Sequence, residues 1–152
     1  MAPAVTGGPA GTGQDHIAAG LPCRAGLERV HHASYPGIPE AVRAARHHVA
    51  DALAGVPAAE DVAYALSEVA SNAVLHSRSG HPGGRFTVAV DIAAGALVAV
   101  VVTDQGGPWK DSGPDFYPHG LQIVRELAAA VRIDGGEDGR TVWVLFPWET
   151  GQ

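Results

Sequence analysis

The sequence is short of cysteine and of long apolar runs, and each shortage excludes a class of protein. The single cysteine, Cys23, excludes an internal disulfide framework and a cysteine-rich zinc site. No stretch reaches the roughly 18 consecutive apolar residues of a membrane-spanning helix. The N-terminus also lacks the basic opening and apolar core of a secretory signal. We therefore expect a cytoplasmic protein with no membrane partner.

Basic residues are also scarce. The 10 lysines and arginines are outnumbered by 16 aspartates and glutamates, which leaves a net charge of −6. Proteins that bind a phosphate backbone normally present a basic surface. We therefore do not expect a nucleic acid as a direct partner.

The familiar glycine-rich phosphate motifs are missing as well. The sequence contains neither the G-x-G-x-x-G of a dinucleotide-binding unit nor the G-x-x-x-x-G-K-[ST] of a Walker-type loop. A nucleotide would have to be bound by another route.

What is present predicts one domain behind a leader. The chain has 152 residues, 46% of them apolar, which suits a single hydrophobic core. Residues 1–27 are rich in Ala, Gly, Pro and Thr without periodicity, so we expect a disordered leader. Residues 28–149 form the predicted domain.

Apolar spacing predicts an alternation of strand pairs and helices in that domain. A helix begins near Pro39, a second spans about 58–77, and a third follows a long loop over 105–119. Five strand-like segments surround them, at 29–35, 86–92, 97–104, 131–134 and 140–146. This order predicts an α+β fold, a two-layer α/β sandwich whose mixed, mostly antiparallel sheet is covered on one face by three helices.

The second helix carries the polar residues of most interest. Leu66, Val69 and Ala73 lie on an apolar stripe, and we expect Glu68 and Asn72 on the opposite, polar side. Residues four apart are neighbours on a helix, so a carboxylate and an amide can act on one small ligand. The simpler interpretation is that both belong to the wet face of an amphipathic helix.

Asp104 stands at the end of the almost wholly apolar strand over 97–104. A carboxylate where a buried strand ends is costly unless something binds it. Two histidine pairs, His31-His32 and His47-His48, suggest a metal site, but adjacent residues point apart, so neither pair chelates a metal alone.

Three spaced motifs carry a family resemblance. Glu68-x-x-x-Asn72-Ala73, Asp104-Gln-Gly-Gly-Pro108 and Gly120-Leu121 resemble the N, G1 and G2 boxes of the GHKL (histidine-kinase-like) ATPases, and the match spans about residues 34–148. Within that superfamily the chain is similar to the stand-alone anti-sigma-factor serine kinases. The resemblance implies a Bergerat-type ATP-binding fold with ATP and Mg²⁺ as cofactors.

The resemblance also implies roles for individual residues. Asn72 would hold Mg²⁺ against the phosphates, and Glu68 would orient or deprotonate the attacking hydroxyl. Asp104 would accept a hydrogen bond from the adenine amine, and Gly106 would let the backbone approach the base. The other expected nucleotide-binding residues are Pro108, Lys110, Gly120 and Leu121.

Two functions follow from the resemblance. In the first, the protein is a serine/threonine kinase that phosphorylates an antagonist protein and otherwise sequesters a sigma factor, with a homodimer left open. In the second, it is a non-catalytic ATP-binding module whose lid controls partner binding. Pro118 favours the second, because it stands where the G2 box usually has a glycine and it has no N–H to offer.

Overall fold

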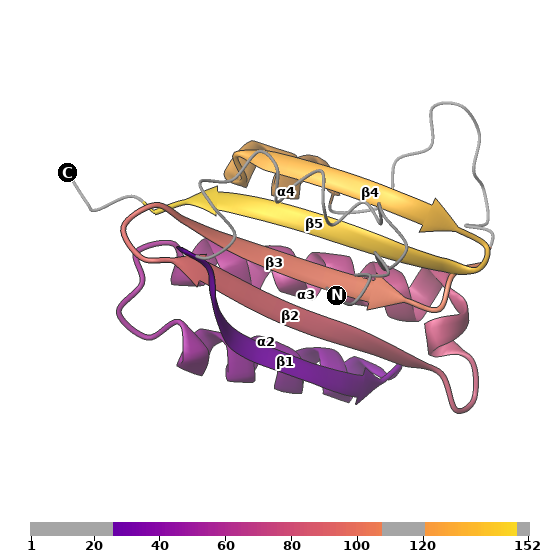
Figure 1. Cartoon of the computed structure of the whole chain (residues 1–152). Helices are drawn as coiled ribbons and strands as arrows, with labels where there is room; N and C mark the ends of the chain where they lie inside the picture. Colours follow the sequence, from indigo (N-terminus) through magenta and orange to yellow (C-terminus); the bar gives the residue numbers. More distant parts are fainter. Residues whose placement is uncertain (1–25, 108–120, 149–152) are drawn as a thin grey trace, which may run out of the picture.

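Three helices lie on one face of a five-stranded sheet in the computed structural model, which describes residues 26–107 and 121–148 (Figure 1). The elements are β1 (Glu28–Pro36), α2 (Pro39–Ala52), α3 (Ala59–His76), the 3₁₀ turn η2 (Arg78–Gly80), β2 (Arg85–Ala93), β3 (Leu97–Asp104), α4 (Leu121–Leu127), β4 (Ala130–Gly136) and β5 (Gly139–Pro147). The predicted α+β sandwich and its order of elements are confirmed. None of these helices is long and apolar enough to cross a membrane.

The strand order is β1-β2-β3-β5-β4. All four pairings are antiparallel, so the described strands form a more regular sheet than the mixed one predicted. Strand β3 pairs with β2 on one side and with β5 on the other. This central position explains why Val98 to Val102 are all buried and why the segment reads as apolar without alternation.

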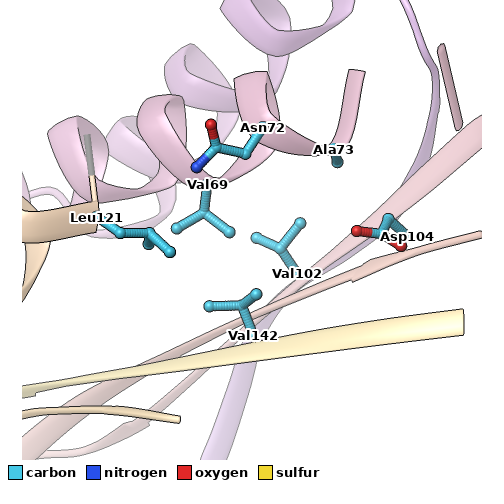
Figure 2. Close-up of a pocket in the computed structure, with 7 residues that line it drawn as sticks. All are labelled: Val69, Asn72, Ala73, Val102, Asp104, Leu121 and Val142. Carbon is cyan, nitrogen blue, oxygen red and sulfur yellow. The ribbon is translucent and has the colours of Figure 1, made fainter. Parts of the chain in front are cut away.

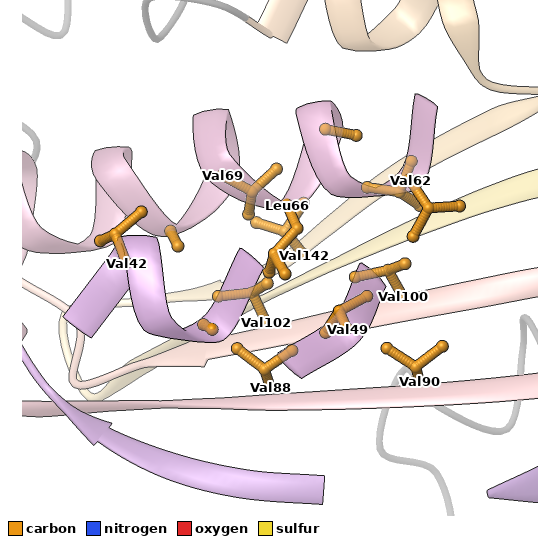
Figure 3. Packing of buried hydrophobic residues seen from close by; sticks show 14 of the residues in the cluster. Val42, Val49, Val62, Leu66, Val69, Val88, Val90, Val100, Val102 and Val142 are labelled. Atoms are coloured by element: carbon orange, nitrogen blue, oxygen red, sulfur yellow. The ribbon is translucent and has the colours of Figure 1, made fainter. Parts of the chain in front are cut away.

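The core lies between the helices and the inner face of the sheet (Figure 3). Val88 and Val90 of β2 and Val100 and Val102 of β3 meet Val49 of α2 in this layer, and all are at most 3% exposed. The buried residues Val42, Ala45 and Val49 of α2 recur at helical spacing, and Leu53, directly after the helix, continues the series. Ile38 is instead 47% exposed, because it caps α2 from outside while Pro39 occupies the first turn.

A second, small apolar cluster lies on the opposite face of the sheet. Ala89, Val101 and Trp143 are neighbours across β2, β3 and β5, and each is buried. Along each strand these outward residues alternate with the residues that face the helices, because successive side chains of a strand point to opposite faces of the sheet.

The histidine pairs take part in a contact between β1 and α2. The Tyr35 hydroxyl lies 2.9 Å from His31 Nε2 and 2.9 Å from His48 Nδ1, so one member of each pair reaches the same oxygen. Burial and the neighbouring His48 and His32 lower the pKa of His31. Within residues 26–107 and 121–148, no three histidine, cysteine or acidic side chains gather as a metal site would require.

Candidate functional site

Helix α3 and the end of strand β3 bring Asn72 and Asp104 to one cavity (Figure 2). The remaining walls are apolar and come from α3, β3, β5 and the first residue of α4; they are Val69, Ala73, Val102, Val142 and Leu121. The volume is about 10 Å³, which is room for a single water molecule. Two polar side chains therefore face a nearly closed apolar space.

Asn72 lies on the buried side of α3, so its predicted place on a wet face is wrong. Its side chain is only 5% exposed. Helix α3 packs against α2, β3 and α4, so much more of its circumference is covered than a single apolar stripe suggests. Asn72 stands at the margin of that stripe, between Val69 and Ala73, and is enclosed with them.

The Asn72 amide has an unmet hydrogen-bonding group. Its Nδ2 atom is buried and has no hydrogen-bond partner in the part of the chain that the structure describes, residues 26–107 and 121–148. A polar atom left in this way costs about 1–3 kcal/mol of folding free energy. Buried orphans of this kind are rare in native proteins and call for an explanation such as a bound ligand. Rotation of the amide would present its oxygen, a hard neutral ligand, at the same place.

Asp104 is held on both carboxylate oxygens. Oδ1 accepts a 2.6 Å hydrogen bond from the Gly106 N–H, and Oδ2 lies 3.8 Å from Nη1 of Arg140. Burial raises the pKa of Asp104, and the Gly106 N–H and the Arg140 charge oppose that rise. The side chain is 7% exposed, so the acid lies inside the protein beside the cavity.

Gly106 is required by the fold of the protein, whether or not a ligand approaches it. Its φ is +75°, a conformation that disfavours residues with a Cβ. A Cβ there would stand 2.4–2.5 Å from backbone atoms of Gly136, Glu137 and Gly139 in the β4–β5 turn. The structure thus gives a different reason for this glycine than the predicted approach to a base.

Comparison with known proteins fits this geometry. The family model described as "Histidine kinase-like ATPase domain" matches residues 35–146, which include Asn72, Asp104 and Arg140. The chain belongs to this family. No curated protein matches.

A solved structure, the RsbU and RsbW domains of Rv1364c from Mycobacterium tuberculosis, resembles this ATPase domain with a TM-score of 0.61 and 24% sequence identity. The match covers 76% of this chain and 31% of that one, so the chain spans under a third of the structure it resembles. At this identity the likeness concerns the fold.

The other predicted residues of the ATPase site are spread over several places. Leu121 forms part of the cavity wall, whereas Glu68, one turn before Asn72, is half-buried and does not line it. His76, the last residue of α3 and one turn after Asn72, lines a separate cavity of about 290 Å³ with Arg78, His81 and Gly107. Pro108, Lys110 and Gly120 lie outside the described residues.

Arg140 is the residue of this site that the sequence reading missed. It is 7% exposed and pairs directly with Asp104 in the β3–β5 register. A signal was available, because Val142, Val144 and Phe146 form the inward set of an alternating strand. Counting back by two places Arg140 on the same inward face.

The residues present fit ATP with Mg²⁺. A carboxylate at the edge of an apolar slot suits the amine and the faces of a purine. Mg²⁺ usually keeps several waters and takes most of its other ligands from substrate phosphates, so the protein needs to supply few oxygens, and the Asn72 amide oxygen would be one of them. The slot is far smaller than an ordinary ligand pocket of about 300–1,000 Å³, so Leu121 must move to admit a base.

Proposed function

We propose that this ATPase domain binds ATP with Mg²⁺ between α3 and β3 and transfers the γ-phosphate to a serine or threonine of an antagonist protein. In this proposal it otherwise sequesters a sigma factor. The observation that carries it is the buried Asn72 side chain, whose Nδ2 atom has no hydrogen-bond partner among the described residues and which shares a cavity with the Asp104 carboxylate. Membership of the histidine kinase-like ATPase family supports the nucleotide.

Asp104 would recognise the base. A carboxylate accepts hydrogen bonds only, so it favours the exocyclic amine of adenine over the carbonyl that guanine presents at the same position. A hydrogen bond to a charged group contributes about 1.5–3 kcal/mol, or roughly a 10- to 150-fold preference. Val102, Val142 and Leu121 would contact the faces of the ring.

Asn72 and Glu68 would act at the phosphates. The Asn72 amide oxygen would hold Mg²⁺, which when bound neutralises charge on the transferring phosphoryl group. Glu68 lies one turn earlier on α3, where residues four apart have Cβ atoms about 5–6 Å from each other. From there its carboxylate would orient the attacking hydroxyl and accept its proton.

A second candidate is a non-catalytic module that binds ATP to grip or release a partner. The position of Glu68 favours it, because that side chain does not line the cavity shared by Asn72 and Asp104. In this alternative, nucleotide binding would alter the region around Leu121, and no phosphate would leave the site.

Glu68→Ala separates the two functions. We expect the variant to bind ATP as the wild type does but to transfer phosphate about 10²- to 10⁴-fold more slowly, the usual contribution of a general base. The assay mixes the protein with γ-labelled ATP, Mg²⁺ and the antagonist protein encoded beside it, and follows the label by gel and mass spectrometry.

Glu60→Ala is the matched control, since Glu60 is an exposed acid in the first turn of the same helix. Label on a serine or threonine of the antagonist supports the kinase. Bound, intact ATP in the wild type supports the module, and normal transfer by Glu68→Ala would show that the base lies elsewhere.

A further inference from the structure

We propose that Arg140 determines the base specificity of this site by keeping Asp104 in its carboxylate form. The inference rests on the proposed adenine-reading role of Asp104. It adds a positioning residue that acts on the nucleotide only through that acid.

The geometry joins the two side chains closely. Asp104 ends β3, Arg140 stands opposite it on β5, and each is 7% exposed. Nη1 of Arg140 lies 3.8 Å from Asp104 Oδ2, and Nη2 donates a 3.0 Å hydrogen bond to the Gly107 carbonyl. The guanidinium therefore bridges the acid and the turn that follows it.

The charge state of Asp104 decides which purine it can read. As a carboxylate it only accepts hydrogen bonds, which suits the adenine amine. As a neutral acid it carries an O–H and can donate to the guanine carbonyl instead. A group that controls this proton also controls the ratio of the two affinities.

Burial and Arg140 act on that proton in opposite directions. Burial raises the pKa of Asp104, whereas the Arg140 charge and the Gly106 N–H lower it. Within residues 26–107 and 121–148, the other charged or titratable side chains near this pair make different contacts or face solvent: Arg78 donates to the Glu137 carbonyl, His76 lines the separate cavity, and Glu137 is exposed. Without Arg140, the pKa of Asp104 rises further.

The sign of the pH effect follows. ATP binding needs the carboxylate, so ATP affinity falls as the pH drops through the pKa of Asp104. Replacing Arg140 raises that pKa and moves the fall to higher pH. GTP affinity changes in the opposite direction over the same range, because the neutral acid donates to guanine.

Arg140→Met tests this by calorimetric titration of ATP and GTP between pH 5 and 8. We expect the midpoint for ATP binding to move to higher pH and the preference for ATP to fall by roughly 10-fold at the acidic end, the loss of one charged hydrogen bond. Arg140→Lys retains a positive charge and should keep most of the preference. Arg132→Met removes an equivalent charge from the half-buried Arg132–Asp134 pair on β4 and should match the wild type.

Two further measurements keep the proposal falsifiable. In an Asp104→Asn background, Arg140→Met should cause no further change in the ATP-to-GTP ratio; an additional loss of preference would overturn the proposal. Carbon-13 NMR of the Asp104 carboxyl in nucleotide-free protein should show a higher midpoint in Arg140→Met than in wild type.

The outcomes distinguish the two levels of inference. If the wild type binds ATP but Arg140→Met leaves the carboxyl midpoint of Asp104 unchanged, or weakens ATP and GTP equally at every pH, the role of Arg140 is refuted and the proposed function is not. A shifted midpoint in a protein whose wild type binds neither nucleotide refutes the proposed function and the specificity role with it.

Discussion

At the scale of a single residue, the Asn72 amide lowers the stability of the fold and at the same time serves the proposed binding of Mg²⁺. Its Nδ2 atom is buried, and none of the described residues gives it a hydrogen bond, a cost that the folded protein without nucleotide must tolerate. A purely structural position of this kind would favour an apolar side chain of similar size. The residue that would hold the metal is therefore also a local weakness of the fold.

Asn72→Leu should strengthen the nucleotide-free protein and remove its proposed activity. Because an unsatisfied buried amide costs about 1–3 kcal/mol, we expect the free energy of unfolding to rise by about 1 kcal/mol. Mg²⁺-dependent ATP binding should be lost. Urea denaturation and calorimetry measure the two effects, with Asn72→Ala as the control that removes the amide without filling its space. A leucine variant that still binds Mg²⁺-ATP would contradict the assignment.

At the scale of elements, the turn after β3 is interlocked with two other segments. The Arg78 N–H donates to the Gly106 carbonyl at 2.8 Å, and the Gln105 N–H donates to Ser79 Oγ at 2.9 Å. On the other side, the Gly107 N–H donates to the Gly136 carbonyl at 3.3 Å. The orientation of Asp104 is therefore fixed by η2 and by the β4–β5 turn together.

Gly106→Ala should break this interlock. An added Cβ meets three backbone atoms within 2.5 Å, so we expect a loss of more than about 2 kcal/mol in the free energy of unfolding. Gly95→Ala is the matched control: its φ is +77° but nothing lies within 4 Å of the added Cβ, so it should cost only about 1–2 kcal/mol. Equal losses in urea denaturation would show that the contact with the β4–β5 turn is unimportant.

Periodicity also explains which parts of the molecule the sequence predicts. The type of each element follows from the spacing of its apolar residues, as in Val42 to Val49 of α2 and the alternating valines of β2. The type and order of the elements were therefore predicted correctly. The burial of Asn72 depends on how many neighbours surround α3, and the Asp104–Arg140 pair depends on β5 lying next to β3. Neither is a local property of the sequence. The motifs therefore indicated Asn72 and Asp104, but not the burial of Asn72 or the pairing of Asp104 with Arg140.

At the scale of the whole molecule, the proposed nucleotide site is a junction of the helical layer and the sheet. Leu121 of α4 closes it, with 1% of its surface exposed, and the space beside it holds only about 10 Å³. In the proposed function, entry of a purine base would require Leu121, and with it the start of α4, to move away from α3 and β5. A nucleotide in that cavity would contact both the helices α3 and α4 and the strands β3 and β5.

Mg²⁺-ATP should accordingly stabilise the entire fold. At a concentration 100 times its Kd, a ligand of the native state adds about 2.7 kcal/mol, which for a domain of this size raises Tm by about 10 °C. Differential scanning fluorimetry with and without Mg²⁺-ATP measures the shift, and EDTA should abolish most of it if the metal contributes. An unchanged Tm at saturating nucleotide would contradict binding at this junction.

The position of β5 has a consequence for biosynthesis. It follows β4 in the chain but lies between β3 and β4 in the sheet, and it carries both Arg140 and Val142. A nascent polypeptide that has not yet extended past Gly139 lacks the strand that pairs with β3 and lacks Arg140, the cation that lies beside Asp104 in the folded protein. We therefore expect ribosome-bound chains to remain unable to discriminate purines until β5 has been inserted.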